Sequence, residues 1–314
     1  MFTNAVLFIT FARPEYARQT FEGIKNAKPS KLYFYSNKAR EENIDEVVRN
    51  ETIRAFVNEI DWDCEVFTFF RDEHVDIYTS LWSALDWVFE NEEQAIVLEE
   101  DCVPSIAFFD YCEKLLVKYK DDPRVWLLSG NNFIEGYNPN NLDYTFSRFP
   151  FMYGWASWQS RWKKMERINI NWKEMKSYGL NEQYALSKKK TKYLTNLHER
   201  IFHTLNYKNA WDHIVGFSLI KDNAFGVIPS FNLVSNIGLS GHHNNGSGVG
   251  FANRAVSIKS NVFEIRNEPK FMAPDYHYDQ KFFYEIFYKK TLFHVKLINK
   301  LKRIKVKILN KLKY

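Results

Sequence analysis

The sequence predicts an α/β fold in which a largely parallel sheet is covered by helices on both faces. Between residues 4 and 130, short apolar runs alternate with longer amphipathic stretches, which is the order of successive βα units. The chain has 314 residues, of which 45% are hydrophobic and 26% are charged. This size and composition predict a globular protein with a large core, and they exclude a disordered chain or a miniprotein.

The first half is expected to contain five strands and four helices. The strands are Ala5–Phe11, Lys31–Tyr35, Glu65–Phe69, Ala95–Leu98 and Val125–Leu128. The helices are Pro14–Asn26, Ile44–Glu59, Asp76–Asn91 and Pro104–Lys120, of which the last two carry a clear apolar face. Pro14 and Pro104 stand where two of these helices are expected to begin, a position that proline favours.

After residue 130 the alternation fades. An aromatic, Asn-rich region covers 131–171, and a basic helical stretch follows at Glu182–Asn206. We expect a further helix at Ile214–Lys221, a short strand at Ala224–Ile228 and a Gly-rich loop at Gly238–Gly250. The chain contains 27 Phe, 18 Tyr and 9 Trp, which predicts an aromatic core or cleft.

Cysteine usage and the N-terminus favour a cytosolic protein. The three cysteines (Cys64, Cys102 and Cys112) are spaced neither as a disulfide framework nor as a zinc knuckle, so we expect reduced thiols. The N-terminal apolar run lacks a preceding basic region and a cleavage site, which favours a buried strand over a signal peptide. No stretch reaches the roughly 18 apolar residues of a membrane-spanning helix.

Charge is unevenly distributed along the chain. The formal charge is +5, but residues 289–314 hold ten Lys or Arg and no acid, which leaves −5 for the rest. Leu and Ile recur there at three- and four-residue spacing, as in a basic amphipathic helix. We expect it to lie on an anionic membrane surface. Docking on the body is the alternative, and nucleic acid is not an expected partner because aromatic residues are few among the lysines.

A run of acidic residues marks the end of the fourth strand. Glu99, Glu100 and Asp101 follow it directly, and ligands of open α/β sheets bind at the carboxyl ends of strands. Adjacent carboxylates repel one another, and their hard oxygen ligands favour Mg²⁺ or Mn²⁺. The alternative is an acidic surface turn.

The first strand is followed by no glycine-rich phosphate loop. Neither the dinucleotide fingerprint nor the P-loop motif occurs in the chain. Instead, Arg13 stands between the first strand and the first helix, where an anion would bind and a guanidinium can clamp a phosphate. An exposed arginine at the start of a helix is the alternative.

Several motifs, taken in order, resemble the bacterial nucleotide-diphospho-sugar glycosyltransferases of the GT-A fold. They are Phe8–Tyr16, Ser83–Phe89, Ile96–Pro104 with Phe108–Phe109, Arg124–Asn131, Tyr153–Trp158, Trp211–Asp212 and Asn232–Gly238. The resemblance covers roughly residues 5–245 and extends to the N-acetylglucosaminyltransferase I type, which inverts the anomeric centre. It implies a GT-A, Rossmann-like domain over residues 1–272, with a nucleotide-sugar-binding half (1–130) and an acceptor-binding half (131–272). Residues 273–314 would form a basic amphipathic C-terminal extension.

The resemblance also implies roles for individual residues. Glu99-Glu100-Asp101 stands where the family has the Glu-Asp-Asp form of its DXD motif, although the middle residue here is Glu. Asp101 would bind the metal, and Glu99 and Glu100 would face ribose or metal-bound water. The other residues expected at the nucleotide sugar are Thr10, Phe11, Ala12, Arg13, Asn37 and Arg71. A histidine of the Gly-rich loop would be a further metal ligand, and we favour His243 over His242.

Asp212 is the expected catalytic base. An inverting displacement needs a carboxylate that takes the proton of the acceptor hydroxyl, and burial beside Trp211 and His213 would raise the pKa of Asp212 towards a useful value. A helix-capping role is the alternative, and Glu135 is a second candidate base. Gly154, Trp155 and Trp211 are expected in a lid over the acceptor or the donor sugar, although the same aromatic residues would also suit an ordinary core.

The sequence thus predicts a metal-dependent enzyme of nucleotide sugars. We expect it to transfer a hexosyl or N-acetylhexosaminyl group, from UDP-sugar above all, to a glycan or lipid-linked acceptor of a bacterial cell envelope. It would be cytoplasmic and peripheral on the inner face of the membrane. The alternatives are a nucleotidyltransferase and a non-catalytic protein that binds carbohydrate or membrane.

Overall fold

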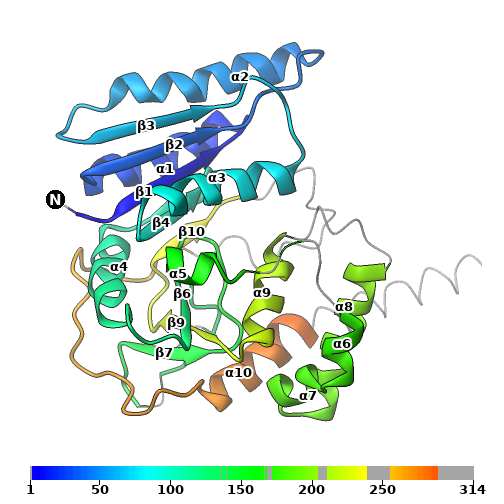
Figure 1. Cartoon of the computed structure of the whole chain (residues 1–314). Helices are drawn as coiled ribbons and strands as arrows, with labels where there is room; N and C mark the ends of the chain where they lie inside the picture. Colours follow the sequence, from blue (N-terminus) through cyan, green and yellow to red (C-terminus); the bar gives the residue numbers. More distant parts are fainter. Residues whose placement is uncertain are drawn as a thin grey trace, which may run out of the picture.

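The computed structural model describes residues 2–134, 136–138, 140–165, 167, 172–203, 211–238 and 255–288. Within these ranges, eight strands form one sheet in the order β3-β2-β1-β4-β8-β6-β9-β7 (Figure 1). They are β1 (Ala5–Thr10), β2 (Lys31–Ser36), β3 (Glu65–Phe70), β4 (Gln94–Glu99), β6 (Val125–Ser129), β7 (Tyr144–Ser147), β8 (Trp155–Trp158) and β9 (Phe225–Pro229).

The sheet is parallel over its first four strands. β3, β2, β1 and β4 share one direction, and β8 lies antiparallel between β4 and β6. β9 is parallel to β6, and β7 is antiparallel to β9 at the far edge. Two short strands, β5 (Cys102–Pro104) and β10 (Val234–Asn236), pair separately beside it. The predicted α/β class with a mostly parallel central sheet is therefore confirmed.

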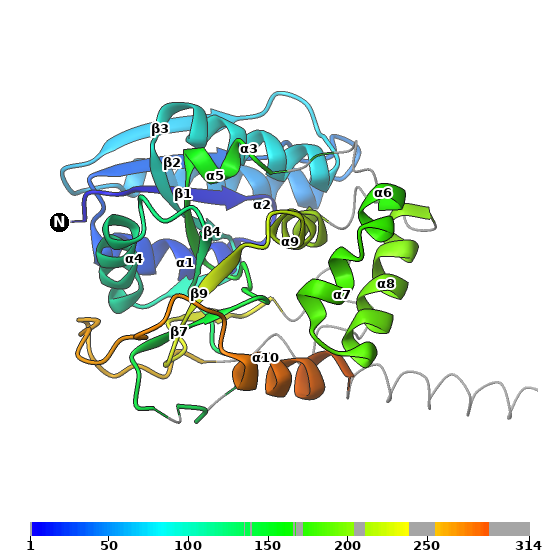
Figure 2. The ribbon, with the colours of Figure 1, turned by 60° about the horizontal axis from the view of Figure 1, so that its bottom comes forward.

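Helices cover both faces of the sheet, as β1 illustrates. Val6 and Phe8 pack in one core, whereas Leu7 and Ile9 pack in the other, because successive side chains of a strand point to opposite faces. The first core is covered by α1 (Pro14–Ala27), α2 (Ile44–Arg54) and α4 (Ile106–Lys118), and the second by α3 (Ile77–Asn91), α5 (Gln159–Trp162) and α9 (Trp211–Lys221). Figure 2 shows α3 and α5 on one side of the sheet, with α1 and α4 on the other.

Two short helices and one long helix follow in the second half of the chain. α6 (Trp172–Ser177), α7 (Leu180–Ala185) and α8 (Lys188–His203) lie together beyond α9 (Figure 2). The basic stretch predicted as one helix from Glu182 is interrupted, because Leu186 adopts a left-handed φ of 53° and ends α7. Positions 204–206 of that prediction lie outside the described residues.

The first half follows the predicted elements closely, with two exceptions. The expected helix Ile44–Glu59 ends at Arg54 and continues as a 3₁₀ turn, Ala55–Glu59. Pro104 ends β5 and does not begin a helix, because Cys102–Pro104 pairs with β10. By contrast, Pro14 is the first residue of α1, as predicted. Cys64, Cys102 and Cys112 are free.

The last described segment, 255–288, ends in a helix that packs on the rest of the domain. α10 (Tyr276–Phe282) continues as a π-helical segment, Phe283–Tyr288. Asp279 is buried and accepts hydrogen bonds from Ser147 Oγ at 2.6 Å and from the Arg148 amide at 3.2 Å. α10 thus packs on the domain, and the boundary expected at residue 272 stays a prediction. The basic stretch 289–314 lies outside the described residues.

None of the helices in the described ranges is long and apolar enough to cross a bilayer.

Candidate functional site

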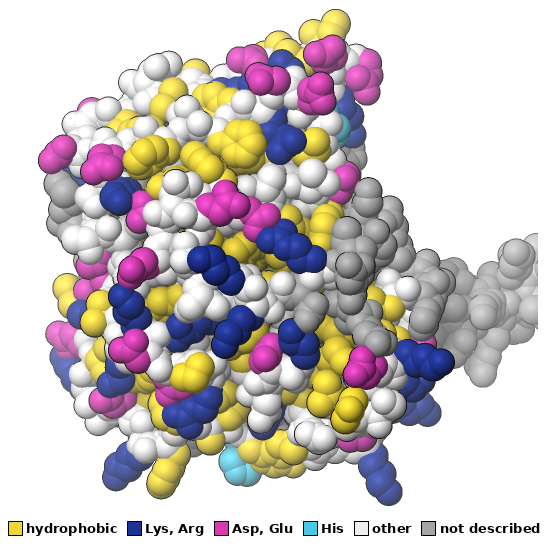
Figure 3. All heavy atoms as spheres, in the orientation of Figure 1, with side chains coloured by type: hydrophobic (Ala, Val, Ile, Leu, Met, Phe, Trp, Pro, Cys, Tyr) yellow, Lys and Arg dark blue, Asp and Glu magenta, His cyan; other side chains and the backbone are white. Residues whose placement is uncertain are grey.

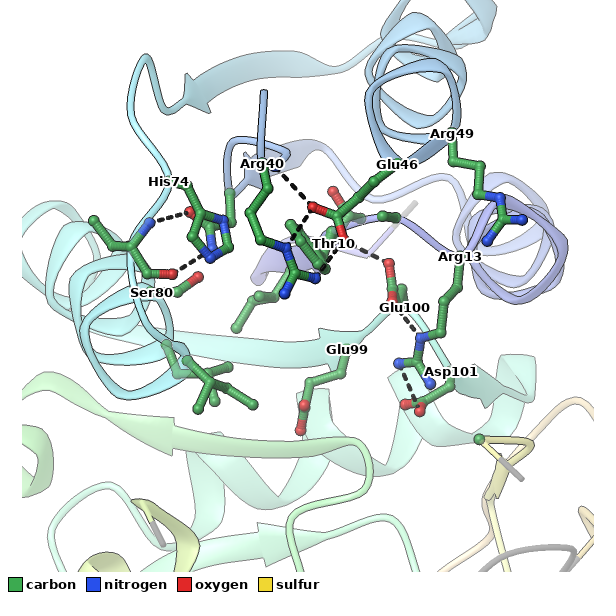
Figure 4. A pocket seen from close by; sticks show the side chains of 18 of the residues that line it. Thr10, Arg13, Arg40, Glu46, Arg49, His74, Ser80, Glu99, Glu100 and Asp101 are labelled. Atoms are coloured by element: carbon green, nitrogen blue, oxygen red, sulfur yellow. Dashed lines mark hydrogen bonds and ion pairs between the residues drawn. The ribbon is translucent and has the colours of Figure 1, made fainter. Parts of the chain in front are cut away.

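A cavity of about 970 Å³ opens at the carboxyl ends of β1, β2 and β4 (Figure 4). Its walls are the segment after β1, residues of α2, the start of α3, the end of β4 and Gly238. The predicted residues that line it are Thr10, Phe11, Ala12, Arg13, Asn37, Glu99, Glu100 and Asp101. Most of the residues expected at the nucleotide sugar are thus brought together.

Arg13 and Glu100 form the back of this site. Glu100 is 4% exposed, and its two carboxylate oxygens accept hydrogen bonds from the Phe11 amide at 2.8 Å and from Arg13 Nε at 2.5 Å. Arg13 also donates from Nη2 to Asp101 Oδ2 at 2.9 Å. Burial opposes the charge of Arg13, but Glu100 and Asp101 outweigh burial and hold the pKa of the guanidinium above its ordinary value. Glu100 therefore fixes the loop after β1.

Glu99 differs from Glu100 because its side chain points into the cavity (Figure 4). Burial raises the pKa of Glu99 to about 8, and the charges of Asp101, Asp212 and Glu100 act in the same direction, against that of Arg13. Glu99 and Asp101 therefore face a common region in which negative charge accumulates.

Asp212 belongs to the same electrostatic neighbourhood, although it comes from a distant part of the sequence. It lies in the first turn of α9, and its Oδ1 accepts a hydrogen bond from the His213 amide at 2.9 Å. Asp212 and Glu99 both raise the pKa of Tyr153, for which burial is the main cause. The burial expected for Asp212 is wrong, because its side chain is exposed.

Asn37 and Thr10 line the cavity with side chains that are already engaged. Asn37 donates to the Val75 carbonyl at 2.9 Å, and its oxygen accepts from the Lys38 amide at 3.0 Å. Thr10 donates to the Tyr35 carbonyl at 3.0 Å. Asn37 thus ties the segment before α3 to the end of β2 and shapes the wall.

Other predicted residues lie away from the cavity wall. Arg71 binds Ser83 Oγ of α3 at 3.1 Å. Trp155 is fully buried in β8, so its expected place in a lid is wrong and it belongs to the core. Gly154 accepts a hydrogen bond from the Gly130 amide and packs against Val234, and Trp211 is 9% exposed in the same core as Trp155. His242, His243 and Glu135 lie outside the described residues.

Several residues of the cavity were not expected from the sequence. Arg40 donates from Nε to Glu46 Oε1 at 3.0 Å, and His74 is hydrogen-bonded to the Lys38 carbonyl at 2.7 Å. Arg49 of α2 also lines the cavity (Figure 4). Their signal in the sequence is weak because α2 presents Glu46 and Arg49 within an ordinary charged helix face.

The residues present fit a hard divalent cation. The cavity lining holds seven carboxylates and only three guanidinium groups, so it repels an anion unless a cation is bound. Within the described ranges, no three acidic, His or Cys side chains form a ready-made metal site. Mg²⁺ and similar ions commonly take one or two carboxylates and complete their shell with phosphates and water. Asp101, with Glu99 beside it, meets that need.

Gly238 keeps the space beside Asp101 open. A methyl group on Gly238 would lie 2.1 Å from Asp101 Oδ2, closer than any non-bonded contact allows. The Ile237 amide donates to the Asp101 carbonyl at 2.9 Å, which holds this segment against the end of β4. Any side chain at Gly238 would therefore displace the Asp101 carboxylate.

Figure 3 shows the surface of the protein in the orientation of Figure 1. Acidic and basic side chains are interspersed there among apolar ones, without a single large patch of either sign.

No family model matches this chain, and no curated protein matches it in sequence. Among solved structures, it is similar to a mannosyltransferase from Pyrobaculum calidifontis in complex with GDP-Man and Mn²⁺, at 11% identity and a TM-score of 0.36. That match covers 54% of this chain and 47% of the mannosyltransferase, so the chain spans about half of its length. Mouse xyloside xylosyltransferase 1 is similar at 12% identity and a TM-score of 0.33, over 70% of this chain and 82% of that one.

A UDP-glucose pyrophosphorylase complexed with UDP-glucose is similar at 8% identity and a TM-score of 0.29, over 52% of this chain and 79% of that one. All three likenesses are partial, and the chemistry of the site rests on the residues of this chain.

Proposed function

We propose that the protein is a metal-dependent glycosyltransferase that moves a sugar from a nucleotide diphosphate sugar to an acceptor hydroxyl. The observation that carries this proposal is the meeting of Glu99 and Asp101, at the end of β4, with the charge of Asp212 from α9 beside an open cavity. A parallel sheet binds ligands at this edge. The ordered motifs that resemble GT-A glycosyltransferases include these same three residues.

In this function Asp101 would hold the metal, and Glu99 would face the ribose or metal-bound water. A bound Mn²⁺ or Mg²⁺ supplies positive charge that stabilises the departing diphosphate. Arg13 and Glu100 keep Asp101 and the loop after β1 in place.

The exposed carboxylate of Asp212 is the base. It takes the proton of the acceptor hydroxyl while that oxygen bonds to the anomeric carbon, and the bond from this carbon to the phosphate oxygen breaks. The nucleoside diphosphate leaves with the electron pair of the broken bond. Attack from the opposite face inverts the anomeric centre.

The finer assignments rest on the resemblance and on the basic tail. We propose a UDP-sugar donor that carries a hexosyl or N-acetylhexosaminyl group, and a glycan or lipid-linked acceptor of a bacterial cell envelope. Residues 289–314, with ten basic residues and no acid, would hold the enzyme on the anionic inner face of the membrane.

Product analysis tests the proposal. The purified protein is incubated with Mn²⁺ and UDP-, GDP-, CMP- and dTDP-sugars, with and without added glycan or lipid-linked acceptors. A glycosyltransferase releases the nucleotide diphosphate from a UDP-, GDP- or dTDP-sugar, or CMP from a CMP-sugar. A nucleotidyltransferase instead converts the nucleotide sugar and added pyrophosphate into a nucleoside triphosphate and a sugar phosphate. Metal-dependent binding of a nucleotide sugar with neither reaction would favour a non-catalytic binding protein.

A further inference from the structure

The arginines that line the cavity differ in how their charge is used. Arg13 donates from Nε to Glu100 and from Nη2 to Asp101. The guanidinium of Arg40 binds both carboxylate oxygens of Glu46. Both cations are therefore neutralised by carboxylates of the protein itself. Within the described residues, Arg49 is the guanidinium of the cavity lining that has no such partner.

The absence of a partner is unexpected from the position of Arg49 on α2. Asp45 lies four residues before it and Glu46 three residues before it, and both spacings favour ion pairs on a helix. No ion pair joins Arg49 to Asp45 among the described residues, and Glu46 is bound by Arg40, from its amide at 2.7 Å and from Nε at 3.0 Å. Arg49 thus remains exposed at the cavity, with its planar fork of donors available.

An unpaired guanidinium at this cavity suits a ligand that carries phosphate groups. A nucleoside diphosphate brings several negative charges into a site where carboxylates outnumber guanidiniums by seven to three. Asp101 would hold a metal ion that compensates part of that repulsion, on the side of the cavity formed by β4. An unpaired arginine on α2 adds two parallel hydrogen bonds from the other wall, the geometry that suits phosphate oxygens.

We propose that Arg49 binds the phosphate groups of the donor, a role that the sequence assigned to Arg13. The inference rests on the proposed function, because the anion is the diphosphate of the nucleotide sugar. Arg13 then acts as a positioning residue that fixes Glu100 and Asp101, and Arg49 contacts the ligand. Arg13 thus gives structural support, whereas Arg49 binds the ligand.

Calorimetric titration of the full chain with Mn²⁺ tests this division. The probes are UDP, UMP, GDP, GMP and inorganic pyrophosphate, and the variants are Arg49→Gln and Arg49→Lys. Arg200→Gln is the matched control, because Arg200 is exposed on α8 and away from the cavity. Arg49→Gln should raise the Kd of the nucleoside diphosphate at least tenfold and that of the monophosphate less. Arg49→Lys should give a Kd between those of the wild type and Arg49→Gln, since lysine keeps the charge but lacks the planar fork of donors.

Each result decides the matter. Equal diphosphate affinity in wild type and Arg49→Gln overturns the role of Arg49 and leaves the proposed function standing. If the wild type binds pyrophosphate with Mn²⁺ but no nucleotide, and Arg49→Gln weakens that binding, Arg49 keeps its role and the nucleotide-sugar function fails. A wild-type protein that binds neither pyrophosphate nor any of the nucleotides overturns both the role of Arg49 and the proposed function. Unchanged circular dichroism and Tm of the variants exclude misfolding as the cause of a lost affinity.

Discussion

Arg13 Nη2 donates to Asp101 Oδ2 at 2.9 Å, so the segment that follows the first strand and the segment that follows the fourth strand are joined directly. Arg13 also binds the buried carboxylate of Glu100, which accepts from the Phe11 amide as well. The loop after β1 and the acidic turn after β4 therefore form one unit. Its loss should affect both stability and ligand binding.

Replacing Arg13 tests this unit. Arg13→Gln leaves Glu100 as a buried charge without its guanidinium, and removal of one partner of a buried pair lowers the free energy of unfolding by about 3 kcal/mol or more. Adding Glu100→Gln to Arg13→Gln should restore part of the loss, because the uncompensated charge disappears. Urea denaturation of the wild type and the single and double variants measures both effects. A single variant as stable as the wild type would show that the ion pair contributes nothing.

Gly238→Ala should close the site beside Asp101. The added methyl group would lie 2.1 Å from Asp101 Oδ2, so the carboxylate must move. We expect metal-dependent nucleotide affinity to fall at least tenfold. Gly216→Ala in α9 is the control, because a methyl group there meets no atom within 4 Å and alanine favours a helix. If Gly238→Ala binds nucleotide as tightly as Gly216→Ala does, the region beside Asp101 is not the binding site.

Asp212→Asn should separate binding from catalysis. The amide keeps the size of the side chain but cannot accept the acceptor proton, so transfer should fall by about 10²-fold or more while donor affinity stays near that of the wild type. Initial rates and titration with the donor measure the two quantities. A near-normal transfer rate would show that Asp212 is not the base and has only a structural role in the first turn of α9. Glu135 would then become the next candidate base.

His198 should make the stability depend on pH. It is packed among Trp172 and Phe217, with ring centroids 5.1 Å away in both cases, and burial lowers its pKa to about 3. In the unfolded chain, His198 is protonated below about pH 6.5, whereas in the folded chain it stays neutral down to about pH 3. The contribution of His198 to the free energy of unfolding is therefore fully present above pH 6.5 and is lost as the pH falls towards 3.

The expected slope is about 1.4 kcal/mol per pH unit from this residue alone. His198→Phe removes the titrating group and keeps an aromatic ring in the same surroundings. Denaturation at pH 7 and at pH 5 should therefore show a smaller difference for the variant than for the wild type. Identical differences would mean that His198 is accessible to protons in the folded chain.

The basic tail gives a prediction that depends on its charge and on its stripe of Leu and Ile. A chain that ends at residue 288 should stay folded, with a net charge of −5, and should lose binding to anionic vesicles. Salt should weaken the binding of the full chain, because the Debye length falls from about 10 Å at 0.1 M to about 3 Å at 1 M. Co-sedimentation at two salt concentrations measures this. Equal sedimentation of both chains would exclude the tail as an anchor, and unfolding of the shortened chain would indicate docking on the body.

Local patterns predicted the first four strands and their helices because each element has its own periodicity. β8 escaped prediction, since Trp155 to Trp158 are all buried and show no alternation between faces. Its place between β4 and β6 depends on pairing between residues far apart in sequence. Trp155 was assigned to a lid for the same reason, because an aromatic side chain in a sequence carries no sign of burial.

The site was predicted as far as strand ends could place it. Glu99, Glu100 and Asp101 lie together because they are consecutive, and parallel strands bring Arg13 to them. The engagement of Asn37 by Val75 arises from a contact across 38 residues, which no local pattern records. Arg49 was missed because its significance lies in the pairing of Arg40 with Glu46.

Titration of a nucleotide sugar into the Asp101→Ala variant tests whether Asp101 holds the metal that binds the donor. The wild type should bind the donor with Mn²⁺ and lose that binding in EDTA. Asp101→Ala should show no metal-dependent binding while its far-UV spectrum stays native, and Asp121→Ala, an exposed aspartate away from the cavity, should behave as the wild type. Undiminished Mn²⁺-dependent affinity in a folded Asp101→Ala variant would show that Asp101 does not hold the metal.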